Sequence, residues 1–224
     1  MTPVERMRAT YERRPVDRLV RATFGWWGET MQRWKREGFE GEPAQAFALD
    51  PMPLVALAQQ GWCDCPFVPP FEEKVVEVRG GYEIRQDSSG RLLQVPQGRW
   101  TDVMPTYLEH TVHSRRDWEE RILPRMDPRQ PERYALIRER GEDVARQVEA
   151  GEVLHDARFI GGYMYLRDLF GPEDVLYVFH DDPQLIHDAM ANWLEVICSV
   201  CCAAQDAAPL FRISIAEDIC YKAG

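Results

Sequence analysis

Two adjacent carboxylates, Glu217 and Asp218, directly follow a β-prone run from Phe211 to Ala216. A pair of acids at the end of a strand can bind a cation or a hydrogen-bond donor of a substrate, or remove a proton as a general base. The same side chains can instead cap a helix or form a salt bridge in a loop. We treat Glu217 and Asp218 as the candidate catalytic residues.

Two further features follow β-prone runs. Gly161 and Gly162 come after the run that begins at Arg158, and paired glycines let a ligand approach the backbone closely. A tight turn is the alternative interpretation. Trp26 and Trp27 come after the run Leu19–Phe24, and they can form an aromatic wall for a flat or one-carbon ligand. Packing against an N-terminal helix is the alternative for the tryptophans.

The sequence of the loop near residue 64 indicates a function less clearly than these features do. Asp64 lies between Cys63 and Cys65 on a Pro-bounded segment, and we include Asp64 among the candidate substrate-binding residues. A second cysteine pair, Cys198 and Cys201, lies inside a long helical pattern, where burial as small hydrophobes explains the spacing. We therefore expect no complete zinc site in this chain. The histidines are expected to be structural.

The elements that must position these residues mix helices and strands. The sequence predicts helices over 2–14, 26–37, 114–126, 131–150, 163–170 and 183–205, with a short helix near 54–60 in an otherwise loop-like stretch. The turn residues within 74–95 predict an antiparallel β-meander. Strand, helix and strand alternate in the later half, which favours parallel α/β architecture.

Composition limits the function classes. The 224 residues carry a net charge of −10, and an acidic surface repels phosphate backbones, so we expect no nucleic-acid partner. No continuous run of about 18 apolar residues and no signal peptide is present, so we expect no membrane association and a cytoplasmic location with reduced cysteines. We allow for a homo-oligomer.

Several segments, in this order and at this spacing, resemble the N-terminal part of uroporphyrinogen decarboxylase-like proteins. They are Pro15–Arg18, Phe24–Thr30, Trp34–Gly38, Pro69–Val75, Asp117–Glu120, Phe170–Asp174, Asp181–His187 and Glu217–Lys222. The superfamily contains tetrapyrrole decarboxylases and methyltransferases that act on methylated corrinoids, and its fold is a (β/α)8 barrel.

The resemblance implies a fold class and a domain. We expect an α/β chain, an incomplete (β/α)8 TIM barrel with an N-terminal helix and an antiparallel β-meander outside the barrel sheet. Residues 1–224 would then be the N-terminal part of one barrel domain, with Phe211–Ala216 as its fourth strand and the later strands missing. Such a half-barrel should expose Ile213 and Ile215 on its open flank and should self-associate and be inactive alone.

Barrel enzymes place their chemistry at the carboxyl ends of the strands. The resemblance therefore implies that Trp26, Trp27, Gly161, Gly162, Glu217 and Asp218 converge at one end of the sheet. The family's decarboxylases have a tyrosine after the third strand, and either Tyr165 or Arg167 aligns there, with Tyr163 beside them. The decarboxylases also carry an Arg-Gln-Ala-Gly-Arg segment after the first strand, which Gly25–Thr30 replaces here.

The function expected first is therefore methyltransferase-like. A methyl group would move from a methylated small molecule or a corrinoid to a thiol or corrinoid, with a corrinoid protein as an expected partner. Uroporphyrinogen decarboxylation is the enzymatic alternative, and an octa-acid substrate needs more fixed cations than this stretch offers. A truncated, non-catalytic binding half-barrel is the third hypothesis. No cofactor is expected within the chain itself, whereas the resemblance implies that a full-length protein can use zinc or a corrinoid.

Overall fold

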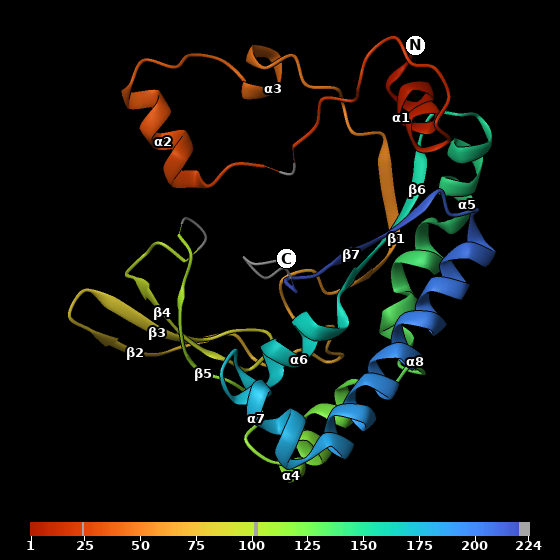
Figure 1. Ribbon diagram of the computed structural model, residues 1–224. Coiled ribbons are helices and arrows are strands. Elements are labelled where there is room, and N and C mark those ends of the chain that lie inside the picture. Colours follow the sequence, from red (N-terminus) through yellow and green to blue (C-terminus); the bar gives the residue numbers. More distant parts are fainter. Residues whose placement is uncertain (24, 101–102, 220–224) are drawn as a thin grey trace.

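The computed structural model describes residues 1–23, 25–100 and 103–219. Its strands form two sheets, one parallel and one antiparallel, which lie apart from each other (Figure 1). The mixed α/β class predicted from the sequence is confirmed.

The parallel sheet has three strands in the order β1-β6-β7 among the described residues. These strands are β1 (Leu54–Gln60), β6 (Leu154–Ile160) and β7 (Arg212–Ala216). Asp156 of β6 pairs with Arg212 of β7, and the β1–β6 register shifts by one residue between Ala56 and Ala58. The described strands form an open sheet and not a closed barrel.

Two long helices cover one face of this sheet, α5 (Ala135–Glu149) and α8 (Pro183–Ala207) (Figure 1). Alternate residues of β6 point to these helices, so Ala157 and Phe159 are fully buried against Val144 and Val200. Burial of this apolar layer fixes α5 and α8 on one side and leaves the other face of the sheet uncovered by them.

The shorter helices follow the strands or precede α5. They are α6 (Gly162–Phe170), α7 (Asp174–Asp181), α4 (Arg115–Asp117), a π-helical turn (Trp118–Ile122) and two 3-10 turns (Leu123–Arg125 and Pro131–Tyr134). The predicted helix over 114–126 is thus divided, because Pro124 has no N–H to donate to the helix ladder. A second core joins α6, α7 and α8 around the fully buried Tyr165 and Leu169.

The antiparallel sheet is the predicted meander. Its strands are β2 (Lys74–Arg79), β3 (Tyr82–Gln86), β4 (Leu92–Pro96) and β5 (Thr106–Glu109), each paired with the next. Two glycines with positive φ, Gly80 and Gly81, make the turn between β2 and β3. The expectation that residues 74–95 lie outside the parallel sheet is confirmed.

The N-terminal segment begins with α1 (Pro3–Tyr11), which lies within the helix predicted over 2–14 and starts with a capping box formed by Thr2 and Glu5. An arm then extends from the body and carries α2 (Gly28–Arg36) and α3 (Pro43–Ala46), at the upper left of Figure 1. At the root of the arm, Asp50 accepts hydrogen bonds from Arg6 and Arg18 at 2.6–2.8 Å.

Two of the predicted strand and helix positions are wrong. Residues 19–23 form no strand, because they have no neighbouring strand to pair with. Leu19 among them is 72% exposed. Phe24, the last residue of the predicted strand, lies outside the described residues. Residues 54–60, predicted as a short helix, form β1. Their Leu, Ala and Gln side chains favour helix, but burial beside β6 overrides that preference.

These corrections change the strand count. Since β1 begins at Leu54 and nothing in 19–23 is a strand, Arg212–Ala216 is the third strand of the described parallel sheet and not the fourth. The strand at Arg158 and the strand at Phe211–Ala216 are correctly placed as parallel neighbours.

Helix α8 alone among the described helices is long and apolar enough, by length and composition, to cross a membrane. The sequence predicts this helix over 183–205, and polar residues interrupt its apolar ones. Its face containing Val196, Ile197 and Val200 is buried among core residues of the protein, as in the core helix of a globular domain.

Candidate functional site

The carboxyl ends of β6 and β7 meet where the sequence placed its main candidates. The N–H of Gly161, after β6, donates to the carbonyl of Ala216, at the end of β7, at 2.6 Å. Glu217 and Asp218 follow at once, so the glycine pair and the acid pair lie together. Parallel strands bring these ends to one side, which is the reason the sequence could place them.

Glu217 caps helix α6. Its two carboxylate oxygens accept from the backbone N–H groups of Tyr163 and Met164, both at 3.0 Å. A negative charge is favourable at a helix N-terminus, where N–H groups lack partners. The carboxylate therefore already has a structural role at the position where catalysis was expected.

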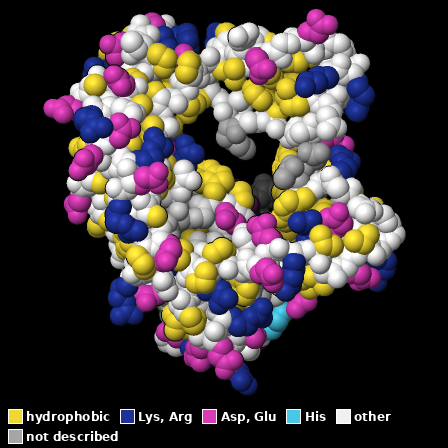
Figure 2. Space-filling view, turned by 180° about the vertical axis from the view of Figure 1, so that it is seen from behind, with side chains coloured by type: hydrophobic (Ala, Val, Ile, Leu, Met, Phe, Trp, Pro, Cys, Tyr) yellow, Lys and Arg dark blue, Asp and Glu magenta, His cyan; other side chains and the backbone are white. Residues whose placement is uncertain are grey.

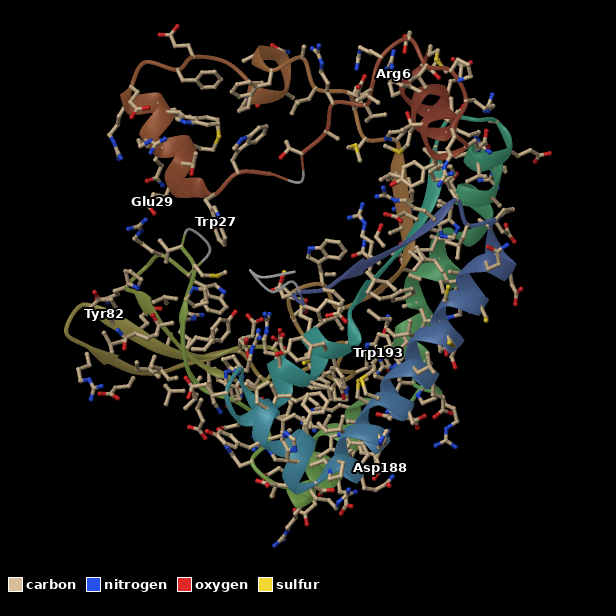
Figure 3. All side chains as sticks on the ribbon, in the orientation of Figure 1. Arg6, Trp27, Glu29, Tyr82, Asp188 and Trp193 are labelled. Carbon is tan, nitrogen blue, oxygen red and sulfur yellow. The ribbon has the colours of Figure 1, made fainter. Side chains whose placement is uncertain are left out.

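The close approach expected at Gly161 and Gly162 is made by the protein's own side chains. A Cβ on Gly161 would lie 2.1 Å from Cδ of Glu217, and a Cβ on Gly162 would lie 2.5 Å from Cε of Met190. Trp193 is near Gly162 as well, and its indole N–H donates to the carbonyl of Ile160 at 3.2 Å (Figure 3). Glycine is required here by packing.

The three candidates on α6 have different environments. Arg167 donates to Asp218 at 2.8 Å, and the Asp218 side chain is 59% exposed, so this pair faces solvent at the carboxyl edge. Tyr165 is fully buried in the core, with no hydrogen-bond partner for its hydroxyl among the described residues. Tyr165 is therefore not a surface for substrate, and Tyr163 contributes its backbone N–H to Glu217.

A buried ionic network behind α6 was not predicted. Arg91 of the meander lies 2.8 Å from both Asp87 and Asp168 of α6, and all three side chains are at most 6% exposed. Although Oδ2 of Asp168 lies 2.8 Å from Arg91, the contact does not have the geometry of a hydrogen bond, and this buried oxygen has no other hydrogen-bond partner among the described residues. Burial raises the pKa of Asp168 to about 6, against the attraction of Arg91. The sequence predicts only a hairpin turn at Asp87–Gly90 followed by a strand from Arg91, and nothing in this pattern indicates a partner for Arg91 on a distant helix.

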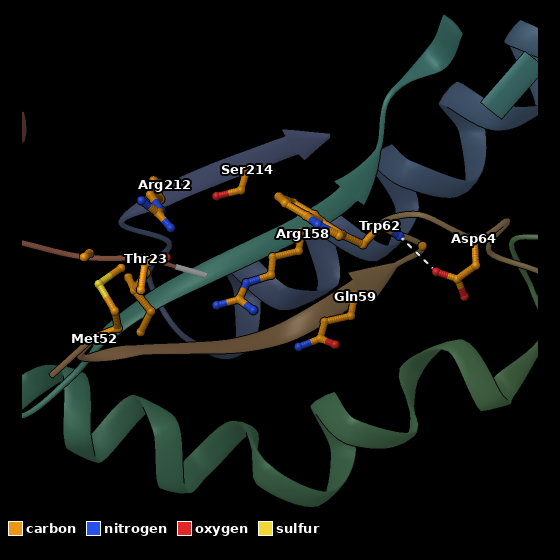
Figure 4. A pocket seen from close by; sticks show the side chains of 11 residues that line it. Thr23, Met52, Gln59, Trp62, Asp64, Arg158, Arg212 and Ser214 are labelled. Atoms are coloured by element: carbon orange, nitrogen blue, oxygen red, sulfur yellow. Dashed lines mark hydrogen bonds between the residues drawn. The ribbon is translucent and has the colours of Figure 1, made fainter. Parts of the chain in front are cut away.

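A cavity of about 860 Å³ lies on the face of the parallel sheet opposite α5 and α8 (Figure 4). Its lining residues come from all three strands, from the loop after β1 and from the root of the arm. They are Ala22, Thr23, Met52, Leu54, Gln59, Gly61, Trp62, Asp64, Arg158, Arg212 and Ser214. The space-filling view shows the molecule hollowed through its middle (Figure 2).

Strand register decides which polar side chains face this cavity. Arg158 pairs with Ser214, and both lie on the face opposite the buried Ala157 and Phe159. Without the register shift in β1, Gln59 would turn toward the helices; the bulge at Leu57 turns it to the cavity face beside Arg158. No local pattern in the sequence indicates this bulge, and the residues of the strands that line the cavity are therefore not among the predicted site residues.

Asp156 is the centre of this polar face. It is fully buried and accepts from Nε of Arg158 at 3.1 Å, from Nε of Arg212 at 3.2 Å and from the hydroxyl of Ser214 at 3.1 Å. Arg212 also donates to the hydroxyl of Tyr11 at 2.5 Å. A buried carboxylate with these partners is satisfied, so it holds both guanidinium groups in place.

The loop after β1 positions Asp64 at the cavity. Gly61 has φ +71°, and a Cβ there would lie 2.3 Å from the carbonyl oxygen of Asp64, so the tight turn needs glycine. The carboxylate of Asp64 accepts from the N–H of Trp62 at 3.2 Å. Burial, with Asp168 and Asp64 nearby, raises the pKa of the Cys63 thiol, and burial raises that of Cys65 further. Neither thiol is activated as a nucleophile.

Trp26 and Trp27 do not join this edge, which corrects the expected convergence. No strand precedes them among residues 19–23, so the parallel-strand argument does not reach them. Trp26 packs with Trp34 and Phe47 on the arm, at ring distances of 6.0 and 6.2 Å, and Trp27 is 53% exposed at the start of α2. Figure 3 shows Trp27 on the side of α2 nearest the meander.

The cysteines of α8 are only partly core residues. Cys201 packs on the apolar layer of the sheet, whereas Cys198 and Cys202 are exposed. Helical spacing places them on neighbouring stripes of the helix, so the expectation of burial is correct for Cys201 alone. Within residues 1–23, 25–100 and 103–219, no group of three or more His, Cys, Asp or Glu side chains is arranged to hold a metal ion.

Comparison with known proteins identifies no relative. No family model matches the chain, and neither a curated protein nor a solved structure matches it.

Proposed function

We propose that this chain forms the first part of a (β/α)8 barrel enzyme related to the uroporphyrinogen decarboxylases, in the methyltransferase-like branch. The observation that carries the proposal is the position of the cavity. It lies on the sheet face opposite α5 and α8, which corresponds to a barrel interior, and Asp64 borders it after the carboxyl end of β1. Barrel enzymes bind their substrates at that end.

The reaction in this proposal is the transfer of a methyl group from a methylated small molecule or methylated corrinoid to a thiolate or a reduced corrinoid. With a methylated corrinoid as substrate and a thiolate as acceptor, a carbon–sulfur bond forms and the cobalt–carbon bond breaks. The electron pair of the broken bond stays on cobalt. Arg158, Gln59 and Ser214 would orient the small substrate in the cavity.

One observation favours the decarboxylase alternative: two guanidinium groups, Arg158 and Arg212, border the cavity, and guanidinium binds carboxylate well. Arg212, however, already donates to Asp156 and Tyr11. One largely available guanidinium suits a substrate with few acidic groups better than an octa-acid, which supports methyl transfer.

The test supplies the purified full-length protein, of which this chain would form the first part, with methylcob(III)alamin and 2-mercaptoethanol under anaerobic conditions. The expected result is the methyl thioether, detected by mass spectrometry, together with loss of the methylcob(III)alamin absorbance. Arg158→Gln should slow the reaction, whereas Arg116→Gln, an exposed arginine on α4, should not.

A parallel reaction with uroporphyrinogen separates the alternatives. Products with fewer carboxyl groups would replace methyl transfer by decarboxylation as the function. Absence of both reactions, in a folded full-length protein, would contradict the proposal and leave the non-catalytic binding role.

A further inference from the structure

We propose that the cavity on the open face of the parallel sheet binds a small monocarboxylic acid with an apolar or aromatic body, and that Arg158 holds its carboxylate. This inference rests on the proposed function and names the substrate class of that site.

Arg158 has unused donors. Its Nε donates to Asp156, which fixes the plane of the guanidinium, and no described residue accepts from its two terminal nitrogens. The side chain is 40% exposed and lies in the cavity wall between Gln59 and Ser214 (Figure 4). A guanidinium anchored through Nε presents two parallel N–H groups, which match the two oxygens of a carboxylate.

The charge at this face suits one negative charge. Two arginines, Arg158 and Arg212, share the single buried carboxylate of Asp156, so the strand centres carry one positive charge in excess. Asp64 adds a negative charge at the end of the cavity beyond β1, where a second acidic group of a ligand would be repelled. A monoanion is therefore preferred over a dianion such as a phosphate monoester.

The rest of the cavity wall suits an apolar body. Met52 and Trp62 are 41% and 42% exposed, and they lie at opposite ends of the polar centre (Figure 4). Leu54 and Ala22 also line the cavity. Exposed large apolar side chains around a cavity are typical of sites that cover the carbon skeleton of a ligand. An aromatic ring between them would leave its carboxylate within reach of Arg158.

The experiment is titration calorimetry of the full chain with three probes of equal ring size: benzoate, benzamide and phenyl phosphate. Benzoate should bind at least tenfold more tightly than either of the others. Arg158→Gln should remove the preference for benzoate over benzamide, and Arg116→Gln, with the same change of charge outside the cavity, should preserve it. Trp62→Leu should weaken benzoate and benzamide by a similar factor, since it removes ring contact and not the anion contact.

Circular dichroism of each variant shows whether it is folded, so a loss of binding in a folded Arg158→Gln protein is interpretable. Equal affinity for benzoate and benzamide, or an unchanged preference in Arg158→Gln, would overturn the inference. Tighter binding of phenyl phosphate would overturn the monoanion assignment. Because binding is measured without a methyl donor, benzoate binding without methyl transfer would refute only the proposed function, and methyl transfer without benzoate binding would refute only this inference.

Discussion

The carboxylate of Glu217 lies where a side chain on Gly161 would have to be. A Cβ at Gly161 would lie 2.1 Å from Cδ of Glu217, while both carboxylate oxygens accept N–H groups of α6 at 3.0 Å. One residue after β6 and one after β7 thus form a single unit that joins the two strands to the first turn of the helix. The absence of a side chain on Gly161 is what permits the cap.

This unit predicts a strong coupling between the two positions. Gly161→Ala should displace Glu217 and lose its two charge-assisted hydrogen bonds, a destabilisation of roughly 2–3 kcal/mol. Glu217→Ala should lower the free energy of unfolding by about the same amount. The double variant should be only slightly less stable than either single variant, because both changes remove the same contacts. Urea denaturation measures the free energy of unfolding of the two single variants and of the double variant. Additive losses would show that Gly161 acts independently of the cap.

Asp168 predicts a dependence of stability on pH. Its pKa in the folded protein, about 6, is higher than its ordinary value of 3.8, because of burial. Between these values the folded protein binds more protons than the unfolded chain, so the Asp168 contribution to stability falls as the pH rises from about 4 to about 6. The full change corresponds to roughly 3 kcal/mol.

The measurement compares wild type with Asp168→Asn by denaturation at several pH values. The difference in free energy of unfolding between the two proteins should change from about pH 4 to about pH 6 and stay constant above pH 6. Asp87→Asn serves as the matched control, since Asp87 pairs with the same Arg91. If the difference in free energy of unfolding between wild type and Asp168→Asn does not vary from pH 4 to pH 6, Asp168 has an ordinary pKa.

The open edge of the parallel sheet predicts self-association. Ile213 and Ile215 of β7 are 51% and 54% exposed, and no described strand pairs with the outer edge of β7. An unpaired apolar edge favours contact between molecules, and a lysine there opposes it. Ile215→Lys should lower the concentration-dependent association seen by sedimentation velocity. Leu176→Lys, on the exposed side of α7, should not, and equal effects of the two would point to net charge as the cause.

The aromatic cluster of the arm predicts local and not global stability. Helix α2 buries no residue, and Trp34 holds the arm together through contacts with Trp26, Phe39 and Phe47. Trp34→Ala should therefore speed proteolytic cleavage within residues 25–48 by about tenfold. Thermal unfolding of the sheet and its helices should change little, because no residue of the arm enters their cores. A large fall in the main unfolding temperature would mean that the arm is part of the core.

Local sequence signals determined several elements and one part of the site. The capping box at Thr2 and Glu5 specified the start of α1, and turn residues specified the β-meander. Alternating strands and helices in the later half predicted that β6 and β7 are parallel. That relation was sufficient to place Gly161 beside Glu217, because parallel strands end on the same side.

Only the tertiary structure decided the rest. The run 54–60 has helix-favouring residues and becomes β1 because β6 lies beside it, while residues 19–23 have no such neighbour and remain outside any sheet. The bulge at Leu57 then turns Gln59 toward Arg158, and Asp156 joins Arg158 to Arg212. These contacts join residues up to 99 positions apart, as Gln59 and Arg158 are, and the partners are set by strand register, which no local pattern in a single sequence specifies.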